Sequence, residues 1–528
     1  MKVLLADAVS AECGRLLEDA GHEVIDRPGQ ARADLQSTLA NCEGLVVRSA
    51  TTVDAALMDA APELQVIGRA GSGVDNIDVE AATARGIIVM NAPGENTLSA
   101  AEHAWAMLMA ISRNVVRGHD SMVQGQWSKK GLMGVELHSK TLGVLGLGRI
   151  GREVATRAKA FGMTVLVYDP FLPSGAAEAI GVELCELDAI WPRADFLTVH
   201  APLTDKTHHL VDARALSLCK DGVRVVNCAR GGLVDEAALL DALDSGRVAG
   251  AALDVFEQEP LPADSPLRSH AGLVLTPHLG ASTSEAQDKV AIRIAEQFND
   301  YFARDLVRNA VNMIALEPQV AERLAPWQKL AETIGLVHAE VMDGQFGEVE
   351  VSISGEIREL PLRAFTSAVL KGFLSVLLSE RINLVNAEAV ARSRGFEVRE
   401  VRGNETDGYS GLLTVRLRSA EAEHVIEGAV FGVNHPKIVR VDDFYVETDA
   451  RGDVLFVQND DVPGRLAAVA AVIAKYDVNI ADFALGRNRE SGQAMNAVHL
   501  DNPLGESALQ EVRDVQGVHW ARLVRMPR

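Results

Sequence analysis

The sequence predicts an α/β protein with two doubly wound parallel-sheet domains, followed by an α+β domain and a small ferredoxin-like domain. Two series of short apolar segments, each separated by helix-like stretches, predict the two parallel sheets, because such alternation is typical of βαβ units. Residues 453–528 read strand, helix, strand, strand, helix, strand, which is the order of the split βαβ arrangement. A length of 528 residues is too great for one hydrophobic core and fits several domains.

The first series of apolar segments opens the chain. Its members are KVLLADA, HEVID, GLVVRS, LQVIGRAG and IIVMNAP, and a long helical pattern from about Thr97 to Arg117 follows them. A second long helical pattern, from about Ser284 to Arg304, is placed to carry the chain back to this first unit. We therefore predict a discontinuous first domain of residues 1–97 and 284–313, around a second domain of residues 98–283.

The second series begins at Thr141 with TLGVLGLG and continues with MTVLVYD, DFLTVH, GVRVVN, GAALDV and GLVLTP. Beyond Asn312 the character of the chain changes, because EVEVSISGEI alternates apolar and polar residues, as an antiparallel strand does. We predict a third domain of residues 314–452 and a terminal domain of residues 453–528.

Charge and cysteine usage exclude several classes of protein. The formal net charge is −22 with no long basic run, which argues against nucleic acid as a partner. An anionic substrate must therefore be held by local arginines. The five cysteines form no CxxC pair, which argues against a structural metal. The N-terminal MKVLLADAVSAE reads as a strand and not as a signal peptide. No 18-residue apolar run occurs, which argues against a membrane span. We expect a cytoplasmic protein with no membrane span and no metal.

A dinucleotide fingerprint lies at the start of the second series. Gly146, Gly148 and Gly151 form GLGRIG after an apolar strand and open a helix, and Asp169 ends the next strand. The first glycine permits a tight turn, the second admits the pyrophosphate, and the third allows close packing of helix and strand. The helix N-terminus attracts phosphate. A carboxylate at Asp169 favours a free ribose diol over a 2′-phosphate, which predicts NAD as the cofactor.

Polar side chains follow three successive strands of the second series. Arg230 follows GVRVVN, Asp254 and Glu259 follow GAALDV, and His278 follows GLVLTP. Since ligands bind beyond the carboxyl ends of parallel strands, these segments should converge on one crevice. Removal of hydride from a hydroxyl carbon needs a base, a carboxylate that orients it, and a cation for the substrate. His278, Glu259 and Arg230 have these chemistries.

The first series supplies a second cluster. Arg48 and Arg69 end two strands, and the glycine-rich loop around Ser72 can present backbone N–H groups to an anion. Asn96 begins the helix that leads to the second domain. The spacing leaves two interpretations open, a cleft for a small dianionic acid such as a phosphorylated one, or an ordinary carboxylate site.

The motifs GLGRIG, YDP, VHAPLT, NCARGGLVDE, ALDVFEQEP and PHLGAST, in this order, resemble the D-2-hydroxyacid dehydrogenase family over about residues 1–313. The resemblance implies that Arg230, Glu259 and His278 are catalytic. It also implies a set of contacts with NAD. That set is Gly146, Gly148, Arg149, Ile150, Gly151, Asp169, Ala201, Cys228, Asp254, His278 and Gly280. In this arrangement Cys228 lines the pocket and is not a nucleophile.

Within that family, VVRSAT, GRAGSGVDNID and the C-terminal extension look like the long-form D-3-phosphoglycerate dehydrogenases. This resemblance implies oxidation of 3-phosphoglycerate to 3-phosphohydroxypyruvate, the entry step of serine synthesis, in a homo-oligomer, which we expect to be a homotetramer. The implied substrate contacts are Arg48, Ser49, Arg69, Gly71, Ser72, Gly73 and Asn96. Residues 314–452 resemble the intervening domain of the same enzymes, with Lys437 and Arg440 as candidate anion contacts.

Residues 453–528 look like an ACT domain, a small module that senses amino acids. The loop that contains Asp461 and Gly464 leads into a helix N-terminus suited to a carboxylate. Asn479 begins the next strand and could hydrogen-bond the ligand across a domain–domain interface. L-serine is the expected effector, although Asn459 stands where some serine-sensitive relatives carry a tyrosine. A domain that serves only in dimerisation is the alternative.

Two other functions fit parts of the pattern. A glyoxylate or hydroxypyruvate reductase would share the catalytic residues, but the additional arginines and the C-terminal extension disfavour it. An NAD-sensing binding protein without turnover is disfavoured because such a sensor needs no paired acid and base.

Overall fold

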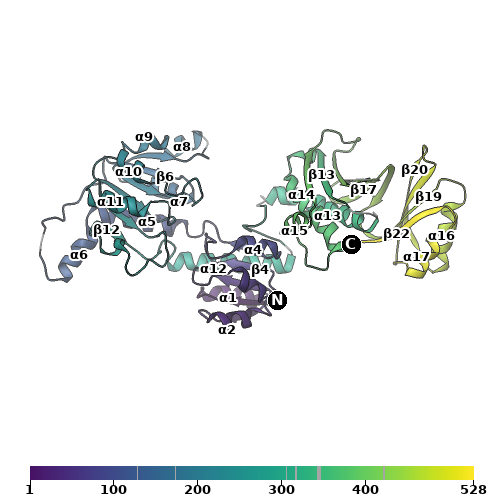
Figure 1. Ribbon diagram of the computed structural model, residues 1–528, viewed down its shortest axis with the longest axis horizontal. Helices are drawn as coiled ribbons and strands as arrows, with labels where there is room; N and C mark the ends of the chain where they lie inside the picture. Colours follow the sequence, from purple (N-terminus) through teal and green to yellow (C-terminus); the bar gives the residue numbers. More distant parts are fainter. Residues whose placement is uncertain are drawn as a thin grey trace.

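The chain folds around four separate β-sheets, which lie in a row in Figure 1. The computed structural model describes residues 1–127, 129–172, 174–304, 306–314, 318–341, 346–419 and 422–527. Arg528, the last residue of the predicted terminal domain, lies outside these ranges. Within them, no helix has the length and apolarity needed to cross a membrane. The architecture confirms the predicted fold class of two parallel sheets followed by two α+β units.

The first sheet is parallel and has the strand order β2-β1-β3-β4-β5. Its strands are short and apolar because helices cover both faces. We call this sheet and its helices the N-terminal lobe. The strands are β1 (Lys2–Leu5), β2 (Glu23–Asp26), β3 (Gly44–Val47), β4 (Val66–Arg69) and β5 (Ile88–Asn91), and the helices between them are α1 (Ala11–Asp19), α2 (Arg32–Leu39), α3 (Ala55–Asp59) and α4 (Val79–Ala84).

A helix from much later in the chain completes this lobe. Helix α12 (Ser284–Arg304) packs against α1 and against strands β4 and β5. Ile294 and Phe298 are fully buried there. A Cβ atom built on Gly68 would lie 2.6 Å from the Ile294 side chain, so the glycine lets helix and sheet approach closely. The limits 1–97 and 284–313 stay a prediction.

The second sheet, with the helices around it, is called the second lobe. It is parallel with the order β12-β11-β10-β9-β6-β7-β8, so the order reverses between β6 and β9. The two-residue strand β8 was not predicted. Its strands are β6 (Thr141–Leu145), β7 (Thr164–Tyr168), β8 (Glu183–Leu184), β9 (Phe196–Val199), β10 (Val223–Asn227), β11 (Val248–Leu253) and β12 (Leu273–Leu275). The helices are α7 (Arg149–Ala160), α8 (Ser174–Ile180), α9 (Leu187–Ile190), α10 (Ala213–Leu218) and α11 (Glu236–Asp244), with a 3-10 turn at Pro266–Ser269.

The prediction of a single long helix from about Thr97 to Arg117 is wrong in one respect. The structure has two helices, α5 (Thr97–Ser112) and α6 (Val115–Val123), which are separated at Asn114. Asn114 adopts φ 49° and ψ 41°, a left-handed conformation that asparagine tolerates better than most residues and that ends a helix. Helix α5 packs on the second lobe, whereas α6 projects from it (Figure 1) and buries none of its side chains.

The third unit contains a mixed sheet of order β14-β13-β15-β16-β17-β18. Strand β13 is antiparallel to β15, as predicted, but parallel to β14. Helices α13 and α14 touch backbone to backbone, since a Cβ atom on Gly335 would lie 2.0 Å from the Val369 carbonyl oxygen. The strands are β13 (Glu348–Gly355), β14 (Glu397–Arg402), β15 (Gly411–Arg418), β16 (Glu423–Phe431), β17 (His435–Val441) and β18 (Phe444–Asp449). The helices are α13 (Pro318–Val341), α14 (Leu362–Leu377) and α15 (Ala387–Ser393), with a 3-10 turn at Glu356–Glu359.

The terminal unit has the predicted ferredoxin-like order, with an antiparallel sheet β20-β21-β19-β22. Phe456, Met495 and Val524 belong to a core that the third unit shares. The two units therefore support one another. The elements are β19 (Gly452–Asp460), α16 (Arg465–Lys475), β20 (Ile480–Asn488), β21 (Gln493–Leu500), α17 (Glu506–Arg513) and β22 (Val518–Met526).

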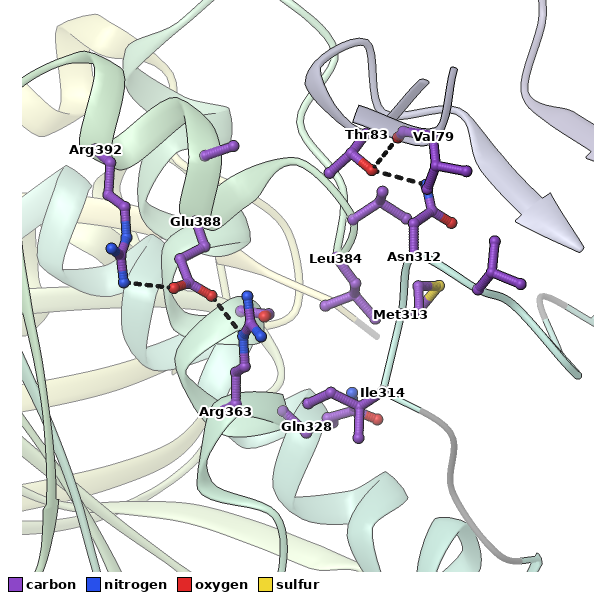
Figure 2. A pocket seen from close by; sticks show the side chains of 15 residues that line it. Val79, Thr83, Asn312, Met313, Ile314, Gln328, Arg363, Leu384, Glu388 and Arg392 are labelled. Carbon is purple, nitrogen blue, oxygen red and sulfur yellow. Dashed lines mark hydrogen bonds and ion pairs between the residues drawn. The ribbon is translucent and has the colours of Figure 1, made fainter. Parts of the chain in front are cut away.

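The third unit is docked on the N-terminal lobe. Asn312, which lies in the N-terminal lobe just before the third unit begins, donates hydrogen bonds to the Ile87 carbonyl oxygen at 2.9 Å and to the Thr83 hydroxyl at 3.1 Å. Asn383 donates to the Gly86 carbonyl oxygen at 2.6 Å. A cavity of about 670 Å³ lies at this junction, and Figure 2 shows Arg363 and Arg392 paired with Glu388 on the wall opposite Thr83.

Candidate active site

The turn between β6 and α7 has the shape that a pyrophosphate requires. Gly146 has φ 101°, and a Cβ atom there would lie 2.7 Å from the His200 carbonyl oxygen and 3.0 Å from the Ala201 nitrogen. A Cβ atom on Gly151 would lie 2.1 Å from the Gly146 carbonyl oxygen, whereas one on Gly148 would meet no atom within 4 Å. The turn is therefore closed on the side of the sheet and open above the N-terminus of α7, where an anion fits.

Asp169 is held beside this turn by backbone donors. Its carboxylate accepts hydrogen bonds from the Leu147 N–H at 2.9 Å and the Phe171 N–H at 3.0 Å. The predicted contacts Arg149 and Ile150 begin helix α7, so they flank the same opening. The residues present fit a dinucleotide that carries free ribose hydroxyls, because a 2′-phosphate would meet the charge of Asp169.

Asp254 organises the turn that carries His278. The carboxylate is fully buried and accepts hydrogen bonds from Thr276 at 2.5 Å, the Leu279 N–H at 2.7 Å and the Gly280 N–H at 2.9 Å. His103 lies 3.1 Å from the same carboxylate. Burial alone would raise the pKa of Asp254, but the hydrogen bonds from His103 and Thr276 outweigh burial and hold the pKa below its usual value.

His103 and Thr276 were not predicted to belong to the site. The signal that could have revealed His103 is its position directly before the apolar run AWAMLMAI of α5. Cys228 was predicted to line the pocket, and burial raises the pKa of its thiol. A thiol of this kind is a poor nucleophile.

Glu259 and His278 form a hydrogen-bonded pair. The Glu259 Oε2 and His278 Nδ1 atoms are 2.7 Å apart, and the other Glu259 oxygen accepts from the Phe256 N–H at 3.0 Å. The hydrogen bond to Glu259 raises the pKa of His278, although burial opposes this. The pKa of Glu259 is lowered despite its partial burial, because His278 and the Phe256 N–H bind its carboxylate. The geometry is that of an imidazole whose protonated form a carboxylate favours.

Glu259→Gln is expected to shift the pH profile of oxidation. The acidic limb of kcat/KM reports the loss of a proton from His278 in a base-catalysed step. Because Glu259 raises the pKa of His278, its removal lowers that pKa and moves the limb to lower pH. The measurement is kcat/KM against pH for both proteins, with Glu257→Gln as the matched control. An unchanged limb would show that the two residues are not functionally paired.

Arg230 is fixed at its backbone and reaches towards the N-terminal lobe. Asn227 donates a hydrogen bond to its carbonyl oxygen at 2.8 Å, and its guanidinium donates to the Ala229 carbonyl oxygen at 2.7 Å. The Arg230 Nε atom lies 3.2 Å from Asp75 Oδ2, an ion pair between the two lobes that the sequence analysis missed. A Cβ atom on Gly73 would lie 2.3 Å from the guanidinium, so this loop is in contact with Arg230.

Arg48 and Arg69 bring two more cations to the same region. The Arg48 guanidinium donates to the Ala8 carbonyl oxygen at 3.2 Å. The backbone N–H of Arg48 donates to the Asp7 carboxylate. Burial lowers the pKa of Arg69, and the charge of Arg230 adds to this effect. Among the described residues, neither Arg48 nor Arg69 has a carboxylate within ion-pair distance. Both guanidiniums are therefore available to an anion.

The loop that follows Arg69 is held by its own polar groups. Ser72 donates a hydrogen bond to Asn96 Oδ1 at 2.7 Å, and Asn91 donates to the Ser72 carbonyl oxygen at 2.6 Å. A Cβ atom on Gly71 would clash with the Arg69 guanidinium. The structure thus brings the predicted residues Gly71, Ser72, Gly73 and Asn96 together with Arg69, whereas Ser49 is exposed.

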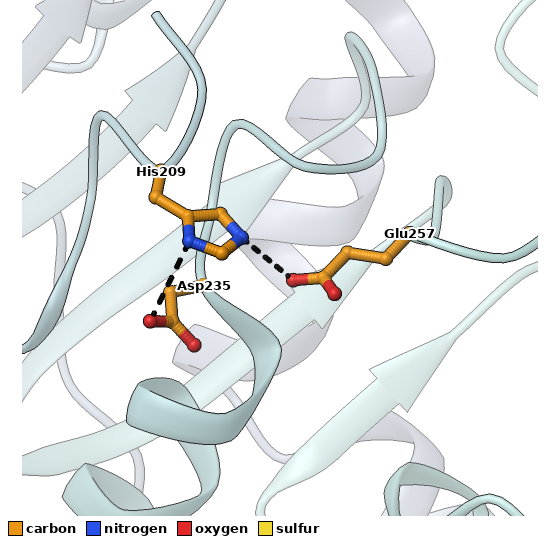
Figure 3. A group of neighbouring side chains, drawn as sticks. All are labelled: His209, Asp235 and Glu257. Carbon is orange, nitrogen blue, oxygen red and sulfur yellow. Dashed lines mark hydrogen bonds and ion pairs between the residues drawn. The ribbon is translucent and has the colours of Figure 1, made fainter.

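Three titratable groups form a separate cluster in the second lobe. Figure 3 shows the imidazole of His209 between two carboxylates, with Nε2 3.1 Å from Glu257 and Nδ1 3.7 Å from Asp235. Their donor atoms lie within 4.8 Å of one another, a spacing compatible with a metal ion. The carboxylates face opposite ring nitrogens, however, so one ion at either nitrogen lies on the far side of the ring from the other carboxylate. A hydrogen bond to Glu257 and a longer contact with Asp235 account for this geometry.

The predicted effector residues do not converge within one chain. Asp461 pairs with Arg487 at 2.7 Å, and Gly464, with φ 90°, precedes α16. Asn479 donates to Asp501 at 2.7 Å. Strands β19 and β20 are both antiparallel to β21, so Asp461 follows the end of one strand and Asn479 precedes the start of a parallel one. The two residues lie at opposite ends of the terminal sheet along the strand direction.

The two candidate anion contacts of the third unit already interact with neighbouring groups of the protein. Lys437 lies 3.8 Å from Asp449 and over the Phe431 ring. Arg440 donates to the Asp442 carbonyl oxygen at 2.6 Å and lies over the Tyr445 ring.

Comparison with known proteins connects this geometry to a family. Residues 105–280 match the NAD-binding domain of the D-isomer specific 2-hydroxyacid dehydrogenases, and residues 323–442 match the intervening domain of D-3-phosphoglycerate dehydrogenase. The D-3-phosphoglycerate dehydrogenase of Archaeoglobus fulgidus is 41% identical over 528 residues, which cover 100% of both chains. The chain belongs to the D-3-phosphoglycerate dehydrogenase family. The enzyme of that name from Synechocystis sp. is 40% identical over 99% of this chain and 95% of its own length, and the human enzyme is 41% identical over 91% and 92%.

Solved structures resemble part of this family member. A Thermus thermophilus protein is 34% identical with a TM-score of 0.55 and covers 59% of this chain and 100% of its own. An NAD-dependent formate dehydrogenase from Staphylococcus aureus, in complex with NAD, is 31% identical with a TM-score of 0.53 and covers 58% of this chain and 98% of its own.

Proposed function

We propose that the chain is an NAD-dependent dehydrogenase that oxidises 3-phospho-D-glycerate to 3-phosphohydroxypyruvate, the first step of L-serine biosynthesis. The observation that carries the proposal is a hydrogen-bonded His278–Glu259 pair in the second lobe, combined with a cluster of arginines at the cleft with the N-terminal lobe. The pair suits proton transfer from a hydroxyl group. The arginines suit a substrate with two separate anionic groups.

Each residue has a distinct role in this proposal. His278 takes the proton of the substrate hydroxyl, and Glu259 stabilises the imidazolium that results. Arg230 holds the substrate carboxylate and polarises the oxygen at the reacting carbon. Arg48 and Arg69 hold the phosphate, with N–H groups of the loop around Ser72. NAD, when bound at the GLGRIG turn and Asp169, accepts the hydride.

The decisive experiment is a substrate panel with the purified chain. We expect NADH to appear with 3-phosphoglycerate and NAD, and little NADH to be consumed with glyoxylate. D-glycerate is the matched control, because it lacks only the phosphate. Faster consumption of NADH with glyoxylate or hydroxypyruvate would favour the reductase, and absence of turnover with every acid would favour a binding protein.

The terminal unit, with the predicted effector residues Asp461 and Asn479, supports regulation by L-serine. Asp461 and Asn479 lie at opposite ends of the terminal sheet, separated by the nine residues of β20, roughly 30 Å in an extended strand. One serine molecule therefore contacts both residues only between two copies of the chain. Asp461 binds Arg487 through Oδ2, which leaves Oδ1 for an ammonium group.

We expect L-serine to lower the activity of the full-length enzyme without competing with NAD, by a coupling of about 1–3 kcal/mol. Calorimetry with L-serine and initial rates against NAD, for the wild type and Asn479→Ala, test this. D-serine is the control ligand. If millimolar L-serine neither binds nor inhibits, the terminal unit is an assembly element.

A homo-oligomer, which we propose to be a tetramer, is supported by helix α6. Val115, Met122 and Val123 are exposed on this projecting helix, and Trp127 beyond it is 81% exposed. Such a surface is typical of a contact with a second copy.

We also propose a cytoplasmic location, since all five cysteines are free thiols.

A further inference from the structure

The ion pair between Asp75 and Arg230 joins the two lobes at the cleft itself. Asp75 lies in the N-terminal lobe, in the loop between β4 and α4, and Arg230 follows β10 of the second lobe. The Arg230 Nε atom is 3.2 Å from Asp75 Oδ2. The proposed function gives Arg230 a different anion, the substrate carboxylate, so the side chain that must bind substrate already has a carboxylate partner.

Asp75 is placed firmly by the residues around it. The neighbouring Asn76 donates hydrogen bonds to the Arg48 carbonyl oxygen at 2.7 Å and to the Thr51 carbonyl oxygen at 2.6 Å. The Ile77 N–H binds the Val74 carbonyl oxygen at 2.9 Å, which closes a turn around Asp75. A loop anchored in this way presents the carboxylate at a defined point, although the side chain itself is 71% exposed.

The charges around Asp75 explain why a carboxylate is needed there. Arg69 is subject to the repulsive field of both Arg230 and Arg48, and Asp75 and Asp7 oppose that field. Asp7 is occupied by the N–H groups of Arg48 and Thr51 and by the Thr51 hydroxyl. Asp75 is thus the carboxylate that directly pairs with a cation of the cluster among the described residues.

We infer that Asp75 is a resident counter-ion, which pairs with Arg230 until the carboxylate of the substrate displaces it. This inference rests on the proposed function of Arg230. Substrate binding is then an exchange of one carboxylate for another at the same guanidinium. Asp75 is a positioning residue that sets the affinity of the cleft for carboxylates and takes no part in proton transfer.

The exchange predicts a gain of affinity when Asp75 loses its charge, which is the opposite of what a supporting role predicts. Asp75→Asn keeps the size of the side chain and removes its competition for Arg230. The dissociation constant of oxalate for the enzyme–NADH complex is expected to fall about two- to fivefold, the range of a partly exposed ion pair worth about 0.4–1 kcal/mol. The KM for 3-phosphoglycerate is expected to fall by a similar factor, with the change in KM and not in kcat.

The experiment is calorimetry with oxalate at low salt, together with steady-state rates. Asp59→Asn is the matched control, because Asp59 lies in the same lobe and pairs with Arg85 at 2.7 Å without reaching the cleft. Asp75→Glu keeps the negative charge and should bind oxalate with the affinity of the wild type. The gain should shrink at high salt, since exposed charges are screened.

Weaker or unchanged binding of oxalate by Asp75→Asn, or a fall in kcat that accompanies a raised KM, would overturn the inference and assign Asp75 a supporting role. The oxalate measurement needs neither turnover nor phosphate. A tighter complex with oxalate in a protein that fails to oxidise 3-phosphoglycerate would therefore reject the proposed substrate and keep the role of Asp75.

Discussion

His278→Asn is expected to lower kcat for oxidation by about 10²–10⁴-fold, the usual contribution of a general base, while NAD still binds. The reason is that the imidazole is the group of the Glu259–His278 pair that can carry a proton near neutral pH. Asparagine is chosen because His278 has φ 56°, a left-handed conformation that asparagine accepts more readily than alanine. A loss of activity is then a loss of chemistry and not of the local fold.

The measurement is kcat from the appearance of NADH, with the affinity for NAD determined separately by calorimetry. His209→Asn is the matched control, because His209 also has a positive φ, of 52°, and also pairs with a carboxylate in the second lobe. His278→Ala should resemble His278→Asn in kcat. Activity within tenfold of the wild type in both His278 variants would reject the assignment of the base.

The parallel sheets could be predicted because each buried strand is a short apolar run. Strand β3, for example, is GLVV and fully buried. The same rule located the site, since Arg230, Glu259 and His278 all follow strands whose carboxyl ends meet at one edge. The pairing of Glu259 with His278 followed from chemistry, as each side chain supplies what the other needs.

The parts that were missed depend on contacts between distant residues. Asp75 and Arg230 are 155 positions apart by their numbers and belong to different lobes, so no local pattern records their pairing. His103 and Asp254 both belong to the second lobe, but they are 151 positions apart by their numbers, so no local pattern records their contact either. The break at Asn114 is a local event, but Asn114 lies within an otherwise helical pattern, and its left-handed conformation becomes evident only in the structure.

The predicted effector site shows which part of a site a local pattern can indicate. Asp461 and Asn479 lie close along the chain, with one helix between them. A helix that connects two parallel strands returns the chain to the opposite end of the sheet. The two residues therefore lie at opposite ends of the strands, which agrees with the expectation that Asn479 reaches a ligand across an interface.

Arg48→Ala is expected to raise the KM for 3-phosphoglycerate by about 10- to 100-fold, because a hydrogen bond to a charged group contributes about 1.5–3 kcal/mol. The effect should depend on the phosphate. The Arg48 guanidinium makes a hydrogen bond to the Ala8 carbonyl oxygen but no ion pair with a described carboxylate, so its charge is available to substrate. The measurement is KM for 3-phosphoglycerate and for D-glycerate with the same enzyme preparation. Only a substrate that carries phosphate loses a contact when Arg48 is removed.

Arg32→Ala is the matched control, because Arg32 belongs to the same lobe and is partly exposed but is already paired with Asp54. It removes the same charge without removing a ligand contact, so any general effect of net charge on an anionic substrate appears there as well. An equal rise of KM for both acids in Arg48→Ala would mean that Arg48 binds the carboxylate or supports the fold. Phosphate recognition would then fall to Arg69, whose pKa is lowered by burial and by the charge of Arg230, and the same pair of substrates would test it.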